Sequence, residues 1–217
     1  MEMLNLLVLS DLHGSEDALK MLGEVEASDR FDLILVCGDF TTYGTAKYVR
    51  RFLSSARTRV LAVPGNCDTP EIVDALEDSG TSLHNRRIDF RGRPFFGFGG
   101  APVTSQQMPF EVEEDMIEDS LMSVAARGGV MVTHTPAYGM NDRGFSGHHS
   151  GSKGIMRVAR EFEPVLAVSG HIHEDRGTRE SGGTVFVNPG PANRGFYAKV
   201  ELGESVGAVL MEHPPRR

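Results

Sequence analysis

Side chains that bind metal ions occur in five short blocks of this chain, and the blocks contain no thiolate pair. Carboxylate, amide and imidazole donors suit Mn, Zn, Fe or Mg, and they do not form a Cys-rich structural zinc site. Seven candidate ligands are too many for one ion and suit two, so the sequence predicts a binuclear metal site. The blocks are Asp11-Leu12-His13, Gly38-Asp39, Gly65-Asn66-Cys67-Asp68, His134 and Gly170-His171-Ile172-His173.

Each block directly follows a short apolar run of the kind that forms buried strands. In open α/β sheets, ligands bind outside the carboxyl ends of the strands. We therefore expect five strands to bring the five blocks to one crevice. The runs are Leu6–Leu9, Leu33–Cys37, Val60–Val63, Val130–Val132 and Val165–Val168.

Helical patterns alternate with these runs in the first third of the chain, which implies parallel strands with right-handed crossovers. Further strands and one hairpin follow, so we expect an α/β fold with two mixed sheets in a four-layer α-β-β-α sandwich. At 217 residues, the chain (1–217) fits one domain. The first predicted helix begins after a Ser15 cap, and the others span Thr45–Ala56, Glu71–Ser79 and Glu111–Arg127. The last has Val112, Met116, Ile117, Leu121 and Val124 on its apolar face. The hairpin pairs Arg87–Phe90 with Pro94–Phe98, and the late strands are Thr184–Val187, Gly195–Leu202 and Ala208–Met211.

Composition narrows the class of protein. The net charge of −8 argues against binding to a nucleic-acid duplex, which normally requires a basic patch. An anionic substrate would then depend on local positive charge, which two divalent metals would supply. The N-terminus lacks a basic signal region, and no stretch has the 18 or so apolar residues of a membrane span, so we expect a cytoplasmic protein that does not bind membranes.

Read in order, the blocks D-x-H, G-D, G-N-x-D, a lone His and G-H-x-H resemble the signature of calcineurin-like metallophosphoesterases. The resemblance runs from Asp11 to His173. It implies that one metal is held by Asp11, His13 and His173, the second by Asn66, His134 and His171, and that Asp39 bridges both. Taken singly, these residues could be helix caps, turn residues or loop histidines, but that reading must explain all of them at five strand ends.

Cys67 departs from the commonest pattern of the resembling family, which has His at this position beside the leaving group. A thiol is a poorer proton donor than an imidazolium, which favours phosphodiesters over monoesters with poor leaving groups. The alternative is a small buried Cys that only fills space. Asp68 is expected to support the site by orienting a ligand or the neighbouring backbone.

Features outside the five blocks carry weaker signals. Residues 135–153 form a long irregular stretch between two ligand blocks, and loops of this length in compact domains are usually functional or disordered. Within it, His149 is a candidate substrate contact, while Ser152 is expected to cap a helix. The turn at 188–191 either lies near the metals or is an ordinary strand end. Arg86, Arg87, Arg91 and Arg93 are expected to form a solvated hairpin face.

The resemblance implies a metal-dependent phosphoesterase that hydrolyses phosphodiester bonds in a small phosphorylated substrate, through a hydroxide bridging two divalent metals. We expect manganese, with zinc, iron, nickel and magnesium as alternatives. The rival functions are a phosphomonoesterase or pyrophosphatase acting on a nucleotide or small metabolite, and a non-catalytic scaffold that keeps the fold, as in a retromer subunit. Scaffolds usually have degraded ligands, whereas every ligand type is intact here. The sequence is compatible with a homo-oligomer.

Overall fold

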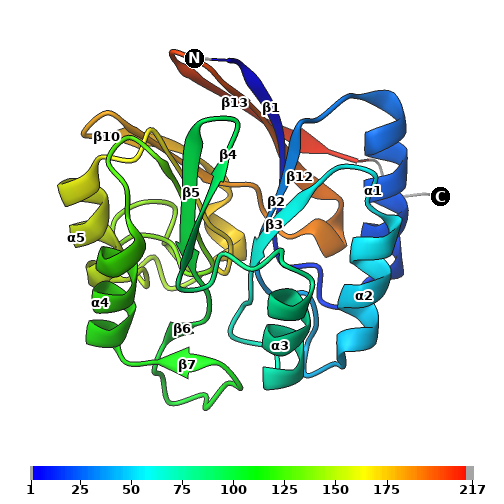
Figure 1. Ribbon diagram of the computed structural model, residues 1–217. Coiled ribbons are helices and arrows are strands. Elements are labelled where there is room, and N and C mark those ends of the chain that lie inside the picture. Colours follow the sequence, from blue (N-terminus) through cyan, green and yellow to red (C-terminus); the bar gives the residue numbers. More distant parts are fainter. Residues whose placement is uncertain (1, 214–217) are drawn as a thin grey trace.

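Two mixed β-sheets pack face to face, and helices cover both outer faces (Figure 1). The computed structural model describes residues 2–213. The expected four-layer α-β-β-α architecture is confirmed. Both sheets have an apolar inner face, because Leu6 and Val8 of the first sheet belong to the same buried cluster as Phe95 and Val132 of the second.

In the part of the chain that the structure describes, the first sheet has five strands. Three parallel strands run from its centre to one edge, and two antiparallel strands from the end of the chain extend it to the other edge. Its outer face is covered by three helices that connect or flank these strands. In spatial order the strands are β13 (Val206–Glu212), β12 (Phe196–Leu202), β1 (Leu4–Leu9), β2 (Leu33–Cys37) and β3 (Val60–Val63), and the helices are α1 (Glu16–Ser28), α2 (Ala46–Ser55) and α3 (Pro70–Asp78).

The second sheet also has parallel strands in its centre, but an antiparallel strand lies at each of its two edges. Two helices cover its outer face, and a small parallel pair of strands lies below it in Figure 1. The strands are β10 (Gly177–Ser181), β11 (Thr184–Asn188), β9 (Leu166–Val168), β8 (Val130–Thr133), β5 (Arg93–Phe98) and β4 (Arg86–Phe90), the helices are α4 (Glu114–Val124) and α5 (Lys153–Phe162), and the small pair is β6 (Ala101–Pro102) with β7 (Glu111–Val112).

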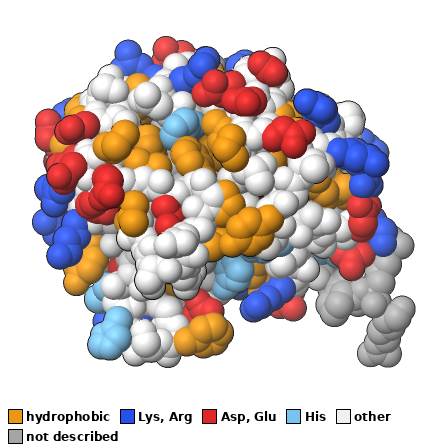
Figure 2. All heavy atoms as spheres, turned by 90° about the horizontal axis from the view of Figure 1, so that it is seen from below, with side chains coloured by type: hydrophobic (Ala, Val, Ile, Leu, Met, Phe, Trp, Pro, Cys, Tyr) orange, Lys and Arg blue, Asp and Glu red, His pale blue; other side chains and the backbone are white. Residues whose placement is uncertain are grey.

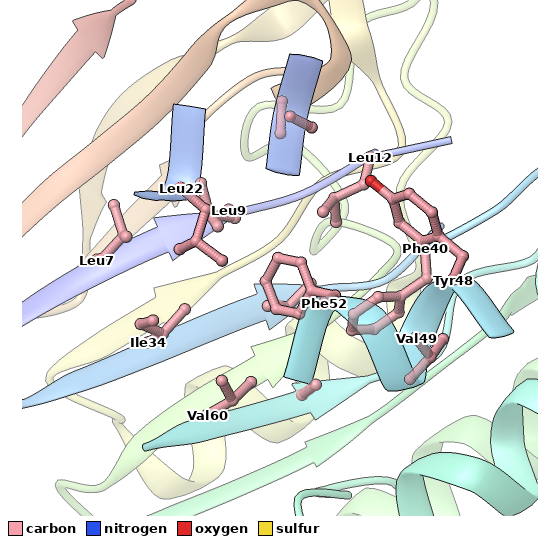
Figure 3. Close-up of a cluster of buried hydrophobic side chains, with 14 of the residues drawn as sticks. Leu7, Leu9, Leu12, Leu22, Ile34, Phe40, Tyr48, Val49, Phe52 and Val60 are labelled. Atoms are coloured by element: carbon pink, nitrogen blue, oxygen red, sulfur yellow. The ribbon is translucent and has the colours of Figure 1, made fainter. Parts of the chain in front are cut away.

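The continuous apolar runs of the sequence arise because the central strands are buried on both faces. Along β1, Leu7 and Leu9 pack toward the helices, while the alternate residues pack between the sheets. Figure 3 shows the helix side, where Ile34 of β2 and Phe52 of α2 lie in the same cluster as these leucines. Full burial of one such side chain contributes about 1.5–3 kcal/mol, so this packing holds the strand ends in place.

Several expectations about local structure are confirmed and several are wrong. Ser15 and Ser152 cap α1 and α5 by accepting hydrogen bonds from backbone N–H groups, and the hairpin forms as β4 and β5. The helix predicted over Glu111–Arg127 is too long, because Glu111 and Val112 pair with Ala101 and Pro102 as β7.

The apolar face predicted for that helix also needs correction. Met116 is 59% exposed, so it does not pack on the sheet. Arg93 is buried and donates to the carbonyl of Gly203 at 3.1 Å, so it is not part of a solvated face. The edge strand β10 was not predicted, because its polar, half-exposed residues lack an apolar run.

The carboxyl ends of the parallel strands of both sheets face the bottom of Figure 1. Figure 2 views the molecule from this end, where histidine side chains are visible among hydrophobic and uncharged ones. Among residues 2–213, no helix has the length and apolar character that crossing a membrane requires.

Candidate metal centre

The segments that carry the ligands leave their strands through sharp turns. Four ligand residues have left-handed backbone dihedrals, with φ of 54° at Asp11, 48° at His13, 51° at Asp39 and 67° at His171. This conformation is uncommon for residues other than glycine, and strain of this kind gathers at functional sites. The turns direct the side chains back across the strand ends.

Asp11, His13 and His173 form the first group of predicted ligands, and the structure brings them together. One potential ligand atom from each lies within 4.8 Å of the other two. His173 Nε2 is 3.2 Å from Asp11 Oδ1, and the His13 and His173 rings meet edge to face. Residues from the segment after β1 and from the turn after β9 thus meet at one point.

Asn66, His134 and His171 form the second group. His134 Nε2 lies 2.8 Å from Asn66 Oδ1. The ring of His171 lies against that of His134, with their centroids 4.9 Å apart. This group draws on the ends of β3, β8 and β9, and so joins both sheets.

Asp39 lies between the two groups. Its Oδ2 is 3.8 Å from His13 Nε2 in the first group, and its Oδ1 is 3.5 Å from His134 Nε2 in the second. Oδ1 also accepts the backbone N–H of Cys67 at 2.8 Å. Because each oxygen faces a different group, this carboxylate has the orientation that a bridge between two ions requires.

Hydrogen bonds orient two of the imidazoles through the nitrogen that faces away from the centre. His134 Nδ1 donates to the carbonyl of Cys37 at 2.7 Å, and His13 Nδ1 is 2.8 Å from Thr42 Oγ1. Such partners fix the ring and direct Nε2 at the metal. The sequence analysis did not identify Thr42 or the Cys37 carbonyl as partners of these rings. Thr42 lies three residues after the ligand Asp39, and its only signal in the sequence is a polar side chain in a loop that carries a ligand.

Glycines next to the ligands allow the backbone segments to approach closely. A Cβ atom on Gly65 would lie 2.0 Å from Asp39 Oδ1, and one on Gly170 would lie 1.7 Å from Ser10 Oγ. Neither space can hold a methyl group. The glycine in the G-N-x-D and G-H-x-H blocks is therefore needed for the loops to pack against Asp39 and β1.

Asp68 supports the centre from behind, in the position that the sequence suggested. Its buried carboxylate accepts the backbone N–H groups of Gly65 at 2.8 Å, Thr41 at 2.9 Å and Phe40 at 3.1 Å. Burial, together with the charge of Asp39, raises the pKa of Asp68 to about 7. The carboxylate ties the loop after β2 to the loop after β3, and so sets the distance between Asp39 and Asn66.

Cys67 is buried in the loop after β3, next to Asn66 and Asp68. Its sulfur is within 4.8 Å of ligand atoms of both His13 and Asp39, so the thiol borders the centre. Burial, reinforced by the nearby Asp39 carboxylate, raises the pKa of Cys67. A thiol, which is a weaker hydrogen-bond donor than an imidazolium, thus stands at this edge of the site.

The protonation of three predicted ligands suits metal binding. Burial lowers the pKa of His171 to about 4, and burial also lowers the pKa of His13, so both rings are neutral near pH 7. Burial alone would raise the pKa of Asp11, but its hydrogen bond with His173 and the adjacent imidazoles lower it instead. Neutral imidazoles and ionised carboxylates are the forms that ligate metals.

One contact tests directly whether these residues fit a cation. His134 Nδ1 is held by the Cys37 carbonyl, so Nε2 faces Asn66 Oδ1 and Asp39 Oδ1. An imidazole nitrogen, an amide oxygen and a carboxylate oxygen from three segments therefore converge on one point. These are ligand types that divalent metal ions accept, so the donor set fits a divalent cation.

The turn at 188–191 and His149, the two other predicted features, differ in their distance from the centre. The turn at 188–191 packs against the centre, since Asn188 Nδ2 donates to the Ile172 carbonyl at 2.8 Å between two ligand histidines. His149 does not join the metal-ligand cluster. Its contacts are with Asp142, at 2.5 Å, and with the ring of Tyr138 in the same loop.

Comparison with known proteins places this geometry in context. A family model described as calcineurin-like phosphoesterase matches residues 4–175. The protein MJ1162 of Methanocaldococcus jannaschii is 32% identical over 202 residues, which cover 87% of this chain and 89% of that protein.

Solved structures share the fold. TT1561 of Thermus thermophilus superposes with a TM-score of 0.74 at 17% identity, covering 96% of this chain and 99% of that chain. A dimetal phosphatase from Danio rerio superposes with a TM-score of 0.64 at 9% identity, covering 97% and 99%. At these identities the likeness concerns the fold alone.

Asp39→Asn is expected to remove metal while leaving the fold intact, because a neutral amide cannot balance two dications. Turnover of a phosphate ester should fall by at least ~100-fold, since even partners outside the ligand set change metal affinity by 10- to 100-fold. Elemental analysis of the purified variant and its circular dichroism spectrum are the measurements. Two tightly bound metals with near-normal turnover would contradict the bridging role.

Proposed function

Since the chain belongs to the calcineurin-like phosphoesterase family, it is a metal-dependent hydrolase of phosphate esters, and we propose that it acts on phosphodiesters. The observation that carries this proposal is the position of Cys67, whose sulfur lies within 4.8 Å of ligand atoms of His13 and Asp39. A good leaving group departs with little need for protonation by an acid. The weakly acidic thiol therefore suits diesters with such leaving groups better than monoesters of simple alcohols.

Two divalent ions, when bound, supply a bridging hydroxide as the nucleophile and stabilise charge on the phosphoryl oxygens. The protein positions everything else. Asp39 sets the separation of the two ligand groups, because its oxygens face His13 and His134. Asn66, beside His134, presents its amide at the point where the loop after β3 meets the loop after β2. We propose manganese as the native metal, since the ligands combine imidazoles with hard oxygens.

His149 is proposed as a substrate contact from the loop over residues 135–152. The buried carboxylate of Asp142 accepts from His149 Nδ1 at 2.5 Å and from the backbone of Gly139 and Gly151. The loop closes on itself beside His134, because Ser152 N–H donates to the Pro136 carbonyl at 2.9 Å. With Nδ1 held, Nε2 of His149 remains available for a hydrogen bond with a substrate phosphate.

Metal removal tests the proposed function as a whole. Dialysis against EDTA should abolish hydrolysis of bis(p-nitrophenyl) phosphate, and Mn²⁺ should restore it better than Ca²⁺, which prefers six to eight oxygen ligands over imidazole. Diester, monoester and pyrophosphate turnover are measured in parallel. Activity that survives prolonged chelation would contradict the metal-dependent mechanism, and a dominant monoesterase or pyrophosphatase activity would contradict the diester proposal.

Cys67→His tests the role of the thiol. If its weak donor ability limits leaving-group protonation, the imidazole should raise monoesterase activity more than diesterase activity. The gain should be larger for alkyl phosphates than for nitrophenyl phosphate, whose leaving group needs little protonation. A fixed or falling ratio of monoesterase to diesterase activity, in a folded and fully metallated variant, would show that Cys67 does not determine specificity.

His149→Ala tests the loop contact, with the neighbouring exposed His148→Ala as a matched control. Loss of a hydrogen bond to a charged phosphate should raise KM by about tenfold. The control should leave KM unchanged, because His148 is exposed, whereas the buried carboxylate of Asp142 holds the ring of His149. Equal kinetics for both variants would remove His149 from the substrate site.

A further inference from the structure

Two loops meet beside the Asn66–Cys67 segment of the metal centre. Tyr43, in the loop after β2, donates its backbone N–H to the Cys67 carbonyl at 3.1 Å, and Phe110, at the end of the β6–β7 loop, donates its own to the Asn66 carbonyl at 3.1 Å. The two loops therefore hold the carbonyls of consecutive site residues. The side chains of these loops therefore lie next to Asn66 and Cys67.

The side chains also connect the two loops. The hydroxyl of Tyr43 donates to the sulfur of Met108 at 3.2 Å. We call Tyr43, Met108 and Phe110 the apolar wall. Its rings are ordered from behind, because the imidazole of His84 lies against Phe110 with centroids 5.2 Å apart and accepts the Gly99 N–H at 3.0 Å.

The wall offers a ring surface to solvent. Tyr43 is 57% exposed although its backbone is fixed by the bond to Cys67 and its hydroxyl by Met108. An exposed large apolar side chain that is held at both ends has little conformational entropy left to lose on binding. Figure 2 shows hydrophobic side chains beside histidines on this end of the molecule.

Charge decides which chemical group suits the wall. Beyond Asp39, the two loops (residues 40–45 and 103–110) contain no Asp, Glu, Lys or Arg. A second phosphate or a polyphosphate would find no cation in these two segments, while a neutral planar ring would stack on Tyr43 and contact the Met108 sulfur. Aromatic rings favour offset or edge-to-face contacts with other rings, and thioethers favour ring edges.

From these contacts we propose that the apolar wall is a subsite for a neutral planar ring, such as an aryl group or a nucleobase, carried by the phosphoester. This inference rests on the proposed phosphoesterase function, because the phosphoryl group must be held at the metal centre for the ring to reach the wall. The subsite contributes binding without hydrogen-bond readout, so it accepts different rings and discriminates against small alkyl groups.

The test compares two phosphonates that cannot be hydrolysed. Phenylphosphonate and methylphosphonate are titrated into the Mn²⁺-loaded protein by calorimetry. Stacking on one aromatic side chain is worth about five- to tenfold in affinity or more. Wild type should therefore bind phenylphosphonate at least about fivefold more tightly, and Tyr43→Ala should lose most of this ratio while its affinity for methylphosphonate stays the same. Tyr43→Phe, which keeps the ring, should retain most of the ratio.

Val209→Ala is the matched control, because Val209 is similarly exposed but lies on the outer strand β13. It should leave both affinities unchanged. A wild-type ratio near one, or a ratio that Tyr43→Ala leaves intact, overturns the subsite while methylphosphonate binding still reports a working metal centre. Failure of both phosphonates to bind the loaded protein would instead contradict the proposed function.

Discussion

The position of the Asp39 carboxylate is the constraint on which the rest of the site depends. A bridging carboxylate must present one oxygen to each of two ligand groups, and here Oδ2 faces His13 while Oδ1 faces His134. The backbone N–H of Cys67 holds Oδ1, and Gly65 approaches so closely that no side chain fits between them. A shift of the loop after β2 would therefore disturb both ligand groups together.

This constraint explains why buried polar groups surround the centre. Asp68 has its own carboxylate out of water, at an energetic cost, yet it satisfies three backbone N–H groups from two loops that have no regular secondary structure. The Cys37 carbonyl and Thr42 orient two imidazoles in the same way. These hydrogen bonds hold the loops and the imidazole rings in one arrangement. Metal ions with preferred ligand distances require such fixed ligands.

The two sheets contribute differently to the site. The first sheet supplies the carboxylates and the amide through the loops after β1, β2 and β3, and the second supplies three of the four histidines through the turns after β8 and β9. The apolar layer between the sheets therefore sets the spacing between acidic and imidazole ligands. Beside this shared centre, the loop of Tyr43 presents apolar side chains, while the loop of His149 is held together by a hydrogen bond to Asp142.

The ligand blocks, the strands before them and the four-layer class could be read from the sequence alone, because strands buried on both faces must be continuous apolar runs and ligands must follow their carboxyl ends. The helix caps Ser15 and Ser152 could also be predicted, because each serine accepts a hydrogen bond from a backbone N–H only three residues away. What only the tertiary structure decided are contacts between segments far apart in the chain. Glu111 and Val112 form a strand and not a helix because Ala101 and Pro102 lie beside them, and Arg93 is buried because the Gly203 carbonyl, 110 residues away, accepts its hydrogen bond. Likewise, the partners of His13, Asp68 and Tyr43 depend on which loops meet, and periodicity along one segment carries no information about that.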